Sequence, residues 1–94
     1  MLKDFEIRKV TFYNDGYALA NVNFRLGPIV IRGAKVFSKG AKRWLSMPGR
    51  MDDSGQWNDL VYFTDDNIRK KIEIAVLQEI DRLNKTSQGE DKND

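Results

Sequence analysis

Apolar and polar residues alternate with a period of two through the first half of the chain, a pattern that is typical of half-buried β-strands. Residues 4–13 begin this pattern, but its parity changes after Ile7, which predicts a β-bulge near Arg8 and Lys9. A turn is predicted at Asn14-Asp15-Gly16. The strand that follows, at residues 17–26, places its apolar side chains on one side: Ala18, Ala20, Val22, Phe24 and Leu26.

Three further strands are predicted before residue 64. A second turn is expected at Gly27-Pro28, and the strand at residues 29–37 changes parity at Gly33, where we expect a bend or a second bulge. A short strand at residues 43–47 and a last strand at residues 57–63 complete the series. Short turns between successive strands predict an antiparallel meander of about five short strands.

The second half of the chain changes to a helical pattern. Because Thr64 or Asp65 can accept hydrogen bonds from the first helical turn, the helix is predicted to begin there and to run to about Leu83. Its apolar arc is wide enough to pack on the sheet and to leave some surface for a partner. The polar residues 85–94 predict a disordered tail. The expected fold is therefore α+β, with a single domain at residues 1–84.

Charge is distributed unevenly along the chain, although the net charge is only +2. Between Gly16 and Met51 there is no Asp or Glu. The basic residues of this stretch are Arg25, Arg32, Lys35, Lys39, Lys42, Arg43 and Arg50. A block with one sign of charge creates a local positive field, which favours a polyanionic partner. The alternative is that cations on strand edges deter edge-to-edge aggregation.

The composition excludes several kinds of chemistry. Because the chain has no Cys and no His, disulfides, thiolate or imidazole metal sites and histidine-based catalysis are excluded. Two adjacent acidic pairs, Asp52-Asp53 and Asp65-Asp66, are explained better by a turn and a helix cap than by a Mg²⁺ site. No phosphate-binding glycine loop is present. We therefore expect a protein that is not an enzyme and that needs no cofactor.

Location and assembly can be predicted only in outline. No run of about 18 apolar residues is present, and the N-terminus lacks the apolar stretch of a secretory signal. We therefore expect a cytoplasmic protein without a membrane span. A core of this size is marginal for an isolated domain, which is a reason to expect a homodimer.

Two basic clusters are candidate phosphate ligands. The first follows the third predicted strand and comprises Lys39, Lys42 and Arg43, with Arg50 a little further on. The second lies in the first helical turns and comprises Arg69, Lys70 and Lys71. Cations at a helix N-terminus oppose the helix dipole, so their presence there indicates a use other than stability.

The two tryptophans, Trp44 and Trp57, lie on either side of the turn at Met47-Pro48. Either ring could stack on a nucleic-acid base. A tryptophan on a strand of a small sheet is more often a core residue, so we expect both rings to have structural roles. No known aromatic RNA-binding motif, helix-turn-helix pattern or zinc-binding pattern occurs.

Several short motifs resemble the SpoVG family of bacterial septation and sporulation proteins. The first is Met47-Pro48 with Arg50, followed by Gly55-Gln56-Trp57 and Asp59. The helix contributes residues 69–72, RKKI, and residues 75–79, AVLQE. Parts of the first three predicted strands resemble the opening strands of the family, so the resemblance covers roughly residues 4–83.

The resemblance implies a small, dimeric α+β protein that binds DNA, and in some members RNA, and that influences septation, sporulation and gene expression. It implies phosphate contacts by Arg50, Arg69 and Lys71. The basic turn of the family usually continues with a second cation, where this chain has Met51 followed by Asp52 and Asp53. Carboxylates at this turn repel phosphate. We therefore expect supporting contacts from the neighbouring cations: Lys39, Lys42, Arg43 and Lys70.

The sequence thus predicts a nucleic-acid-binding regulator with weak sequence preference and steep salt dependence. The alternative is a protein–protein interaction module that pairs through a strand edge or through the apolar arc of the helix, without nucleic acid.

Overall fold

The computed structural model describes residues 4–93, and for residues 14, 15 and 85–93 it describes the backbone alone. The elements in chain order are β1 (Phe5–Asp15), β2 (Ala18–Leu26), β3 (Ile29–Lys39), β4 (Lys42–Ser46), β5 (Gly49–Met51), β6 (Trp57–Asp59) and α1 (Asp66–Asn93). The predicted α+β class is confirmed.

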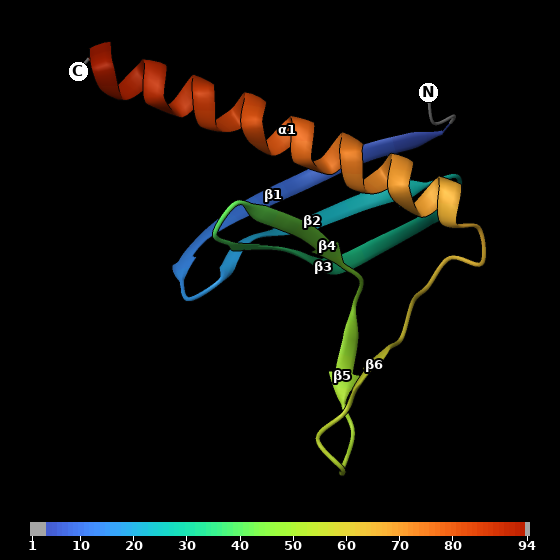
Figure 1. Cartoon of the computed structure of the whole chain (residues 1–94). Coiled ribbons are helices and arrows are strands. Elements are labelled where there is room, and N and C mark those ends of the chain that lie inside the picture. Colours follow the sequence, from blue (N-terminus) through green and yellow to red (C-terminus); the bar gives the residue numbers. More distant parts are fainter. Residues whose placement is uncertain (1–3, 94) are drawn as a thin grey trace.

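The first four strands form one antiparallel sheet in the order β1-β2-β3-β4, as expected of a meander (Figure 1). The register shifts between Ile7 and Lys9, so the bulge predicted from the change of parity is confirmed. A second shift places two residues of β3 opposite Asn23 of β2, at the predicted position of Gly33. Gly33 has a φ of +87°, which is accessible to glycine and strained for other residues.

The last predicted strand, residues 57–63, is shorter than expected and does not join the sheet. Strands β5 and β6 pair only with each other, and this two-stranded arm projects from the sheet on the side away from α1 (Figure 1). The carbonyl of Pro48 accepts hydrogen bonds from the amides of Leu60 and Val61 (2.8 and 3.3 Å). These bonds close the base of the arm, and the outer edge of β4 is already occupied by side chains from α1.

The hydrophobic core lies between one face of the sheet and α1, which crosses that face as a second layer (Figure 1). Its buried residues are Ala20, Val22, Phe24, Ile31, Ala34, Val36, Leu45, Met47, Ile72, Val76 and Ile80. The predicted apolar side of β2 is confirmed as the core side at Ala20, Val22, Phe24 and Leu26. The prediction fails at Ala18, because a register shift before Ala20 pairs Ala18 with Phe37, and Leu19 packs against the core instead. Among the described side chains of α1, Ile74 is the one large apolar residue that remains exposed, so the core uses most of the apolar arc.

The helix begins as predicted and ends later. Asp65 caps it, because its Oδ1 accepts hydrogen bonds from the amides of Asn67 and Ile68 (2.9 and 3.4 Å). The backbone stays helical to Asn93, where the sequence predicted an end near Leu83 and a disordered tail. The residues after Leu83 include no proline that would stop a helix. The division into a domain at residues 1–84 and a tail stays a prediction, and the side chains of residues 85–94 lie outside those described.

Candidate nucleic-acid interface

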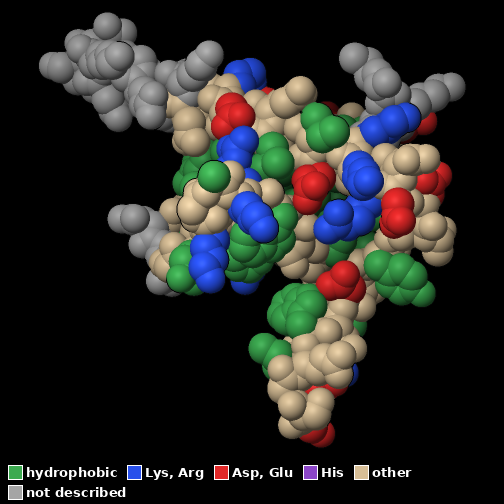
Figure 2. Space-filling view, viewed as in Figure 1, with side chains coloured by type: hydrophobic (Ala, Val, Ile, Leu, Met, Phe, Trp, Pro, Cys, Tyr) green, Lys and Arg blue, Asp and Glu red, His purple; other side chains and the backbone are tan. Residues whose placement is uncertain are grey.

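The seven predicted phosphate ligands do not form one cluster. Lys39 and Lys42 face each other across the β3–β4 hairpin, whereas Lys70 and Lys71 lie near the start of α1. Arg43, which follows Lys42 in the chain, pairs with Asp81 of α1. Asp81 is about 15 Å from Lys71 along the helix axis, so the hairpin lysines and the helix lysines are far apart. In the view of Figure 2, basic side chains accordingly gather in two groups, with acidic side chains beside both. The arm carries Arg50.

Arg43 is committed to holding the hairpin against the helix. Its Nη1 and Nη2 atoms donate to the two carboxylate oxygens of Asp81, at 2.7 and 3.2 Å. This hydrogen-bonded pair raises the pKa of Arg43 above its usual value. Since the charge is paired with a carboxylate in two-point geometry, less of it is available to an external anion, and a phosphate contact by Arg43 stays a prediction.

Arg69 is likewise a structural residue, and it works together with Glu73. The Nη2 atom of Arg69 donates to the carbonyl of Leu45 (3.1 Å), and Oε2 of Glu73 accepts from the amide of Leu45 (2.9 Å). The same Oε2 lies 3.9 Å from Nη1 of Arg69, in an i,i+4 pair. The helix thereby satisfies the N–H and the C=O of Leu45 on the outer edge of β4, which blocks strand addition at that residue.

The sheet has a second face, opposite to α1, that we call the open face. Residues directly opposite each other on paired strands share a face. Because Val36 and Leu45 are paired and point into the core, the neighbouring pairs point away from the helix. These pairs are Lys35 with Ser46, Phe37 with Trp44, and Lys39 with Lys42.

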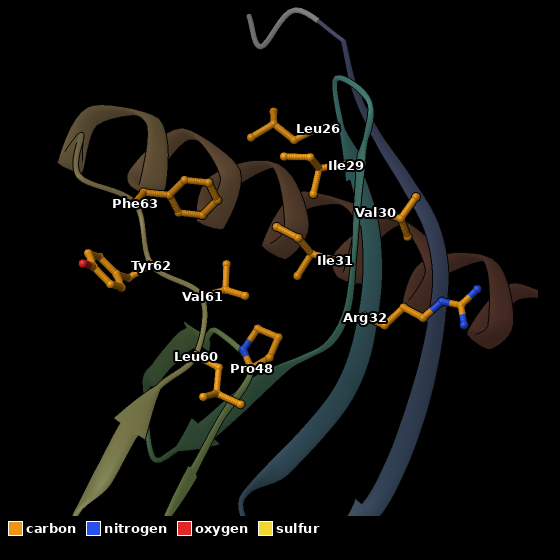
Figure 3. A pocket seen from close by; sticks show the side chains of 10 residues that line it. All are labelled: Leu26, Ile29, Val30, Ile31, Arg32, Pro48, Leu60, Val61, Tyr62 and Phe63. Carbon is orange, nitrogen blue, oxygen red and sulfur yellow. The ribbon is translucent and has the colours of Figure 1, made fainter.

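The open face is strongly cationic. Register places Lys9 on it, opposite Asn23, and Figure 3 shows Arg32 on the side of β3 away from Ile31. With Lys35, Lys39 and Lys42 these are exposed cations that form no salt bridge with any residue the structure describes. Glu6 also lies on this face, but its carboxylate pairs with Arg25 (3.4 Å).

Sequence reasoning missed this face because it grouped cations by their nearness in the chain. Lys9, Arg32 and Lys35 were not among the predicted ligands. The alternation of core and solvent positions was the available signal, since Lys35, Phe37 and Lys39 have the opposite parity to Val36. The bulge at Gly33 obscured that parity for Arg32.

The expectation that both tryptophans belong to the core is wrong. Trp44 is 39% exposed and Trp57 is 49% exposed. On the open face the rings of Trp44 and Phe37 are stacked, with centroids 5.8 Å apart and an interplanar angle of 25°. Nearby, the ammonium of Lys39 lies 5.4 Å from the ring centroid of Tyr17. The open face therefore combines cations with accessible aromatic surface.

The arm is organised by the carboxylate of Asp52. Its Oδ1 accepts hydrogen bonds from the amides of Ser54 and Gln56 and from the Ser54 hydroxyl (2.7–3.0 Å), and its Oδ2 accepts from Asn58. These bonds, led by that from the Ser54 hydroxyl, lower the pKa of Asp52 to about 2. The carboxylate is thus ionised at neutral pH and close to Arg50 in the chain, which makes the arm a poor place for phosphate.

Trp57 packs flat against the start of the arm. A Cβ on Gly49 would lie 2.5 Å from the carbonyl oxygen of Asn58 and 2.8 Å from the Trp57 ring, so this position accepts only glycine without a shift. The indole Nε1 of Trp57 donates to Asp59 (2.8 Å). Motif residues Gly49, Trp57 and Asp59 therefore maintain the arm.

An apolar hollow of about 470 Å³ lies between the first half of β3 and the segment that returns from the arm. In Figure 3 the side chains of Ile31, Val61 and Phe63 point toward it, while the guanidinium of Arg32 points away. Pro48 and the exposed Leu60 close its lower end. The lining of this hollow is apolar apart from Arg32, which borders both the hollow and the open face.

Two further features concern membrane spans and metal sites. No helix among residues 4–93 is both long and apolar enough to cross a membrane. Within the same residues, no group of three acidic side chains is arranged to hold a metal ion.

Comparison with known proteins supports the resemblance predicted from the motifs. The chain is 26% identical, over 82 residues, to the "Putative septation protein SpoVG" of Clostridium perfringens (strain SM101 / Type A). The alignment covers 87% of this chain and 90% of that protein. No family model matches the chain. A small α+β protein with a cationic sheet face is thus similar, over most of its length, to a septation protein of the SpoVG type.

Proposed function

We propose that this chain is a nucleic-acid-binding protein that contacts the phosphate backbone with the open face of its sheet. The observation that carries the proposal is the charge of this face. Among the described side chains it carries Lys9, Arg32, Lys35, Lys39 and Lys42, and the carboxylate of Glu6 on the same face is already paired. Such a surface raises the local concentration of a polyanion and releases counterions when the polyanion binds.

Arg43 and Arg69, which are bonded within the fold, have a structural role in this proposal. Arg43 and Arg69 hold the β4 edge to α1, and thereby keep the helix on the core side and the open face free. Lys70 and Lys71 are exposed near the start of α1, at a separate place. A contribution from Lys70 and Lys71 stays a prediction that the experiment below separates from the open face. A contribution from Arg50 on the arm also stays a prediction.

The biological setting follows from the relative. Since the Clostridium perfringens protein is named for septation, we propose that this chain acts as a regulator in septation or in related gene expression. We further propose that it acts in the cytoplasm as a homodimer, without enzymatic activity and without a cofactor. The exposed hydrophobic arm and the small core are the features that favour a homodimer.

Removing two open-face charges tests the proposed site. We expect Lys39→Gln/Lys42→Gln to weaken binding of labelled duplex DNA by about ten- to a hundredfold at low salt, because two charged hydrogen-bond donors are lost. The slope of log affinity against log salt should become shallower by about two. Fluorescence anisotropy between about 50 and 200 mM salt measures both quantities.

The matched control is Lys70→Gln/Lys71→Gln, which makes the same change in net charge on the helix. Wild-type affinity in this control, with the loss confined to the open-face variant, supports the assignment. An equal or larger loss in the helix variant would move the site to the start of α1. Absence of binding by the wild type at low salt would reject a nucleic-acid function.

A protein-interaction module is the second candidate, and the apolar hollow beside Leu60 and Tyr62 is the observation that favours it. Both side chains are exposed at its rim. Binding through this hollow would bury apolar surface and would therefore depend weakly on salt, in contrast to binding by the open face. The salt slope thus distinguishes the two functions.

A further inference from the structure

Strands β3 and β4 form a hairpin that contributes part of the open face. The central position of this part is occupied by an aromatic pair and not by a cation. Trp44 and Phe37 occupy directly opposite positions on β4 and β3, with stacked rings 5.8 Å apart. Because both residues lie within hydrogen-bonded strands, the position of the pair is fixed by the sheet. Trp44 remains 39% exposed, so part of its large ring surface stays available.

Cations lie on both sides of this pair. Lys35 is two residues before Phe37 and Lys39 two residues after it, each about 7 Å away along β3. Lys42 stands opposite Lys39, beside Trp44 on β4. Beyond the hairpin, the ring of Tyr17 is 60% exposed and already accepts the ammonium of Lys39 at 5.4 Å. The order along the face is thus cation, aromatic ring, cation.

This order matches the repeating parts of a single nucleic-acid strand, in which a base lies between two phosphates. A base can stack on an aromatic side chain only when its face is free. In a duplex both faces of an internal base are covered by its neighbours, and the ring of Trp44 would have no partner. The aromatic centre of the open face is therefore useful to a single strand and useless to an intact duplex.

We propose that the open face binds single-stranded nucleic acid, with one base stacked on Trp44 and the flanking phosphates held by Lys35, Lys39 and Lys42. The proposal rests on the proposed nucleic-acid function and deepens it by naming single strands as the preferred ligand. It assigns affinity to the lysines and the preference for single strands to Trp44.

The test compares Trp44→Leu with wild type, using an oligothymidine single strand and a mixed-sequence duplex as probes. We expect Trp44→Leu to weaken oligothymidine binding by about five- to 150-fold, the range for loss of one base–aromatic stack. Duplex affinity and the salt slope should not change, because no charge is removed. Trp44→Phe keeps a ring and should retain most of the single-strand affinity.

The matched control is Trp57→Leu, which removes the tryptophan of the arm and should leave oligothymidine binding unchanged. The variant Trp57→Phe, with Trp44 unchanged, adds a direct readout, since Trp44 is then the only indole. We expect its fluorescence to be quenched by oligothymidine and not by duplex. This readout needs no substitution at Trp44, so it stands even if Trp44→Leu fails to fold.

Two contrary outcomes are distinguishable. If the lysine variants weaken binding but Trp44→Leu binds oligothymidine as wild type does, and the indole is not quenched, the stacking proposal is overturned while the phosphate-binding function stands. If neither probe binds the wild type at low salt, both proposals fail together.

Discussion

Replacing Ile72 with alanine is expected to lower the free energy of unfolding by about 2–5 kcal/mol, the range for truncating a large aliphatic side chain in a core. Ile72 is 0% exposed and lies on the same face of α1 as Val76 and Ile80. This row is the helical half of the core, so the cavity would open where the helix meets the sheet. Urea unfolding followed by circular dichroism, at one protein concentration, measures the loss.

The matched control for Ile72 is two residues away. Ile74 is 55% exposed on the same helix, and Ile74→Ala should change the free energy of unfolding by no more than about 0.5 kcal/mol. Ile72→Val should cost about 0.5–1.5 kcal/mol and remains measurable if the alanine variant does not fold. Equal losses at Ile72 and Ile74 would contradict the placement of the helix on the sheet.

Replacing Glu73 with alanine is expected to cost about 1–3 kcal/mol, because the amide of Leu45 would lose its acceptor at a partly buried edge. It would also free Arg69 from its 3.9 Å ion pair. The most specific measurement is hydrogen exchange at the Leu45 amide, which should lose protection. Glu73→Gln keeps a carbonyl oxygen at the same reach and should restore much of that protection.

Glu79→Ala is the control for Glu73→Ala, since Glu79 is also a partly buried helical glutamate with an arginine partner. Its partner, Arg82, lies on the same helix at 2.7 Å and is mostly exposed, a kind of pair that contributes about 0–1 kcal/mol. Protection of the Leu45 amide should not change in this variant. Unchanged protection in Glu73→Ala as well would show that the side chain does not cover the β4 edge.

The four strands of the main sheet, the helix start and the bulges near Arg8 and Gly33 could be predicted because each depends on local patterns. A change of parity after Ile7 and at Gly33 marks a bulge whatever the partner strand is. Asp65 was recognisable as a helix cap from its residue type and its place before the apolar repeat. Period-two alternation in β2 identified the core side of the sheet for the same reason.

Local patterns could not predict that only residues 57–59 form a strand and that this strand stays outside the main sheet. The composition of residues 57–63 suits a strand, but strand length depends on an available edge. The outer edge of β4 at Leu45 is occupied by Arg69 and Glu73, which follow Leu45 by 24 and 28 residues in the sequence. Residues 60–63 therefore lead to the start of α1 without a partner strand. The first two of them are held by hydrogen bonds to the carbonyl of Pro48.

The candidate site was predicted in part. Lys39 and Lys42 were identified from the acid-free block and do lie together on an exposed surface. Arg43 and Arg69 were taken for ligands because their partners, Asp81 and Leu45, are 38 and 24 residues distant. Trp44 was assigned to the core because a strand pattern does not tell which face a helix will cover. Here α1 covers the face of Leu45, which leaves Trp44 on the other.

A nuclear magnetic resonance titration shows directly whether the face of the sheet opposite α1 binds nucleic acid. Isotopically labelled protein would be titrated with oligothymidine at low salt while backbone amide and indole signals are followed. We expect the largest changes at Lys35–Lys42 and at the indole of Trp44, with little change at Lys70 and Lys71. Changes confined to the start of α1 or to the arm, or no changes at all, would contradict this expectation.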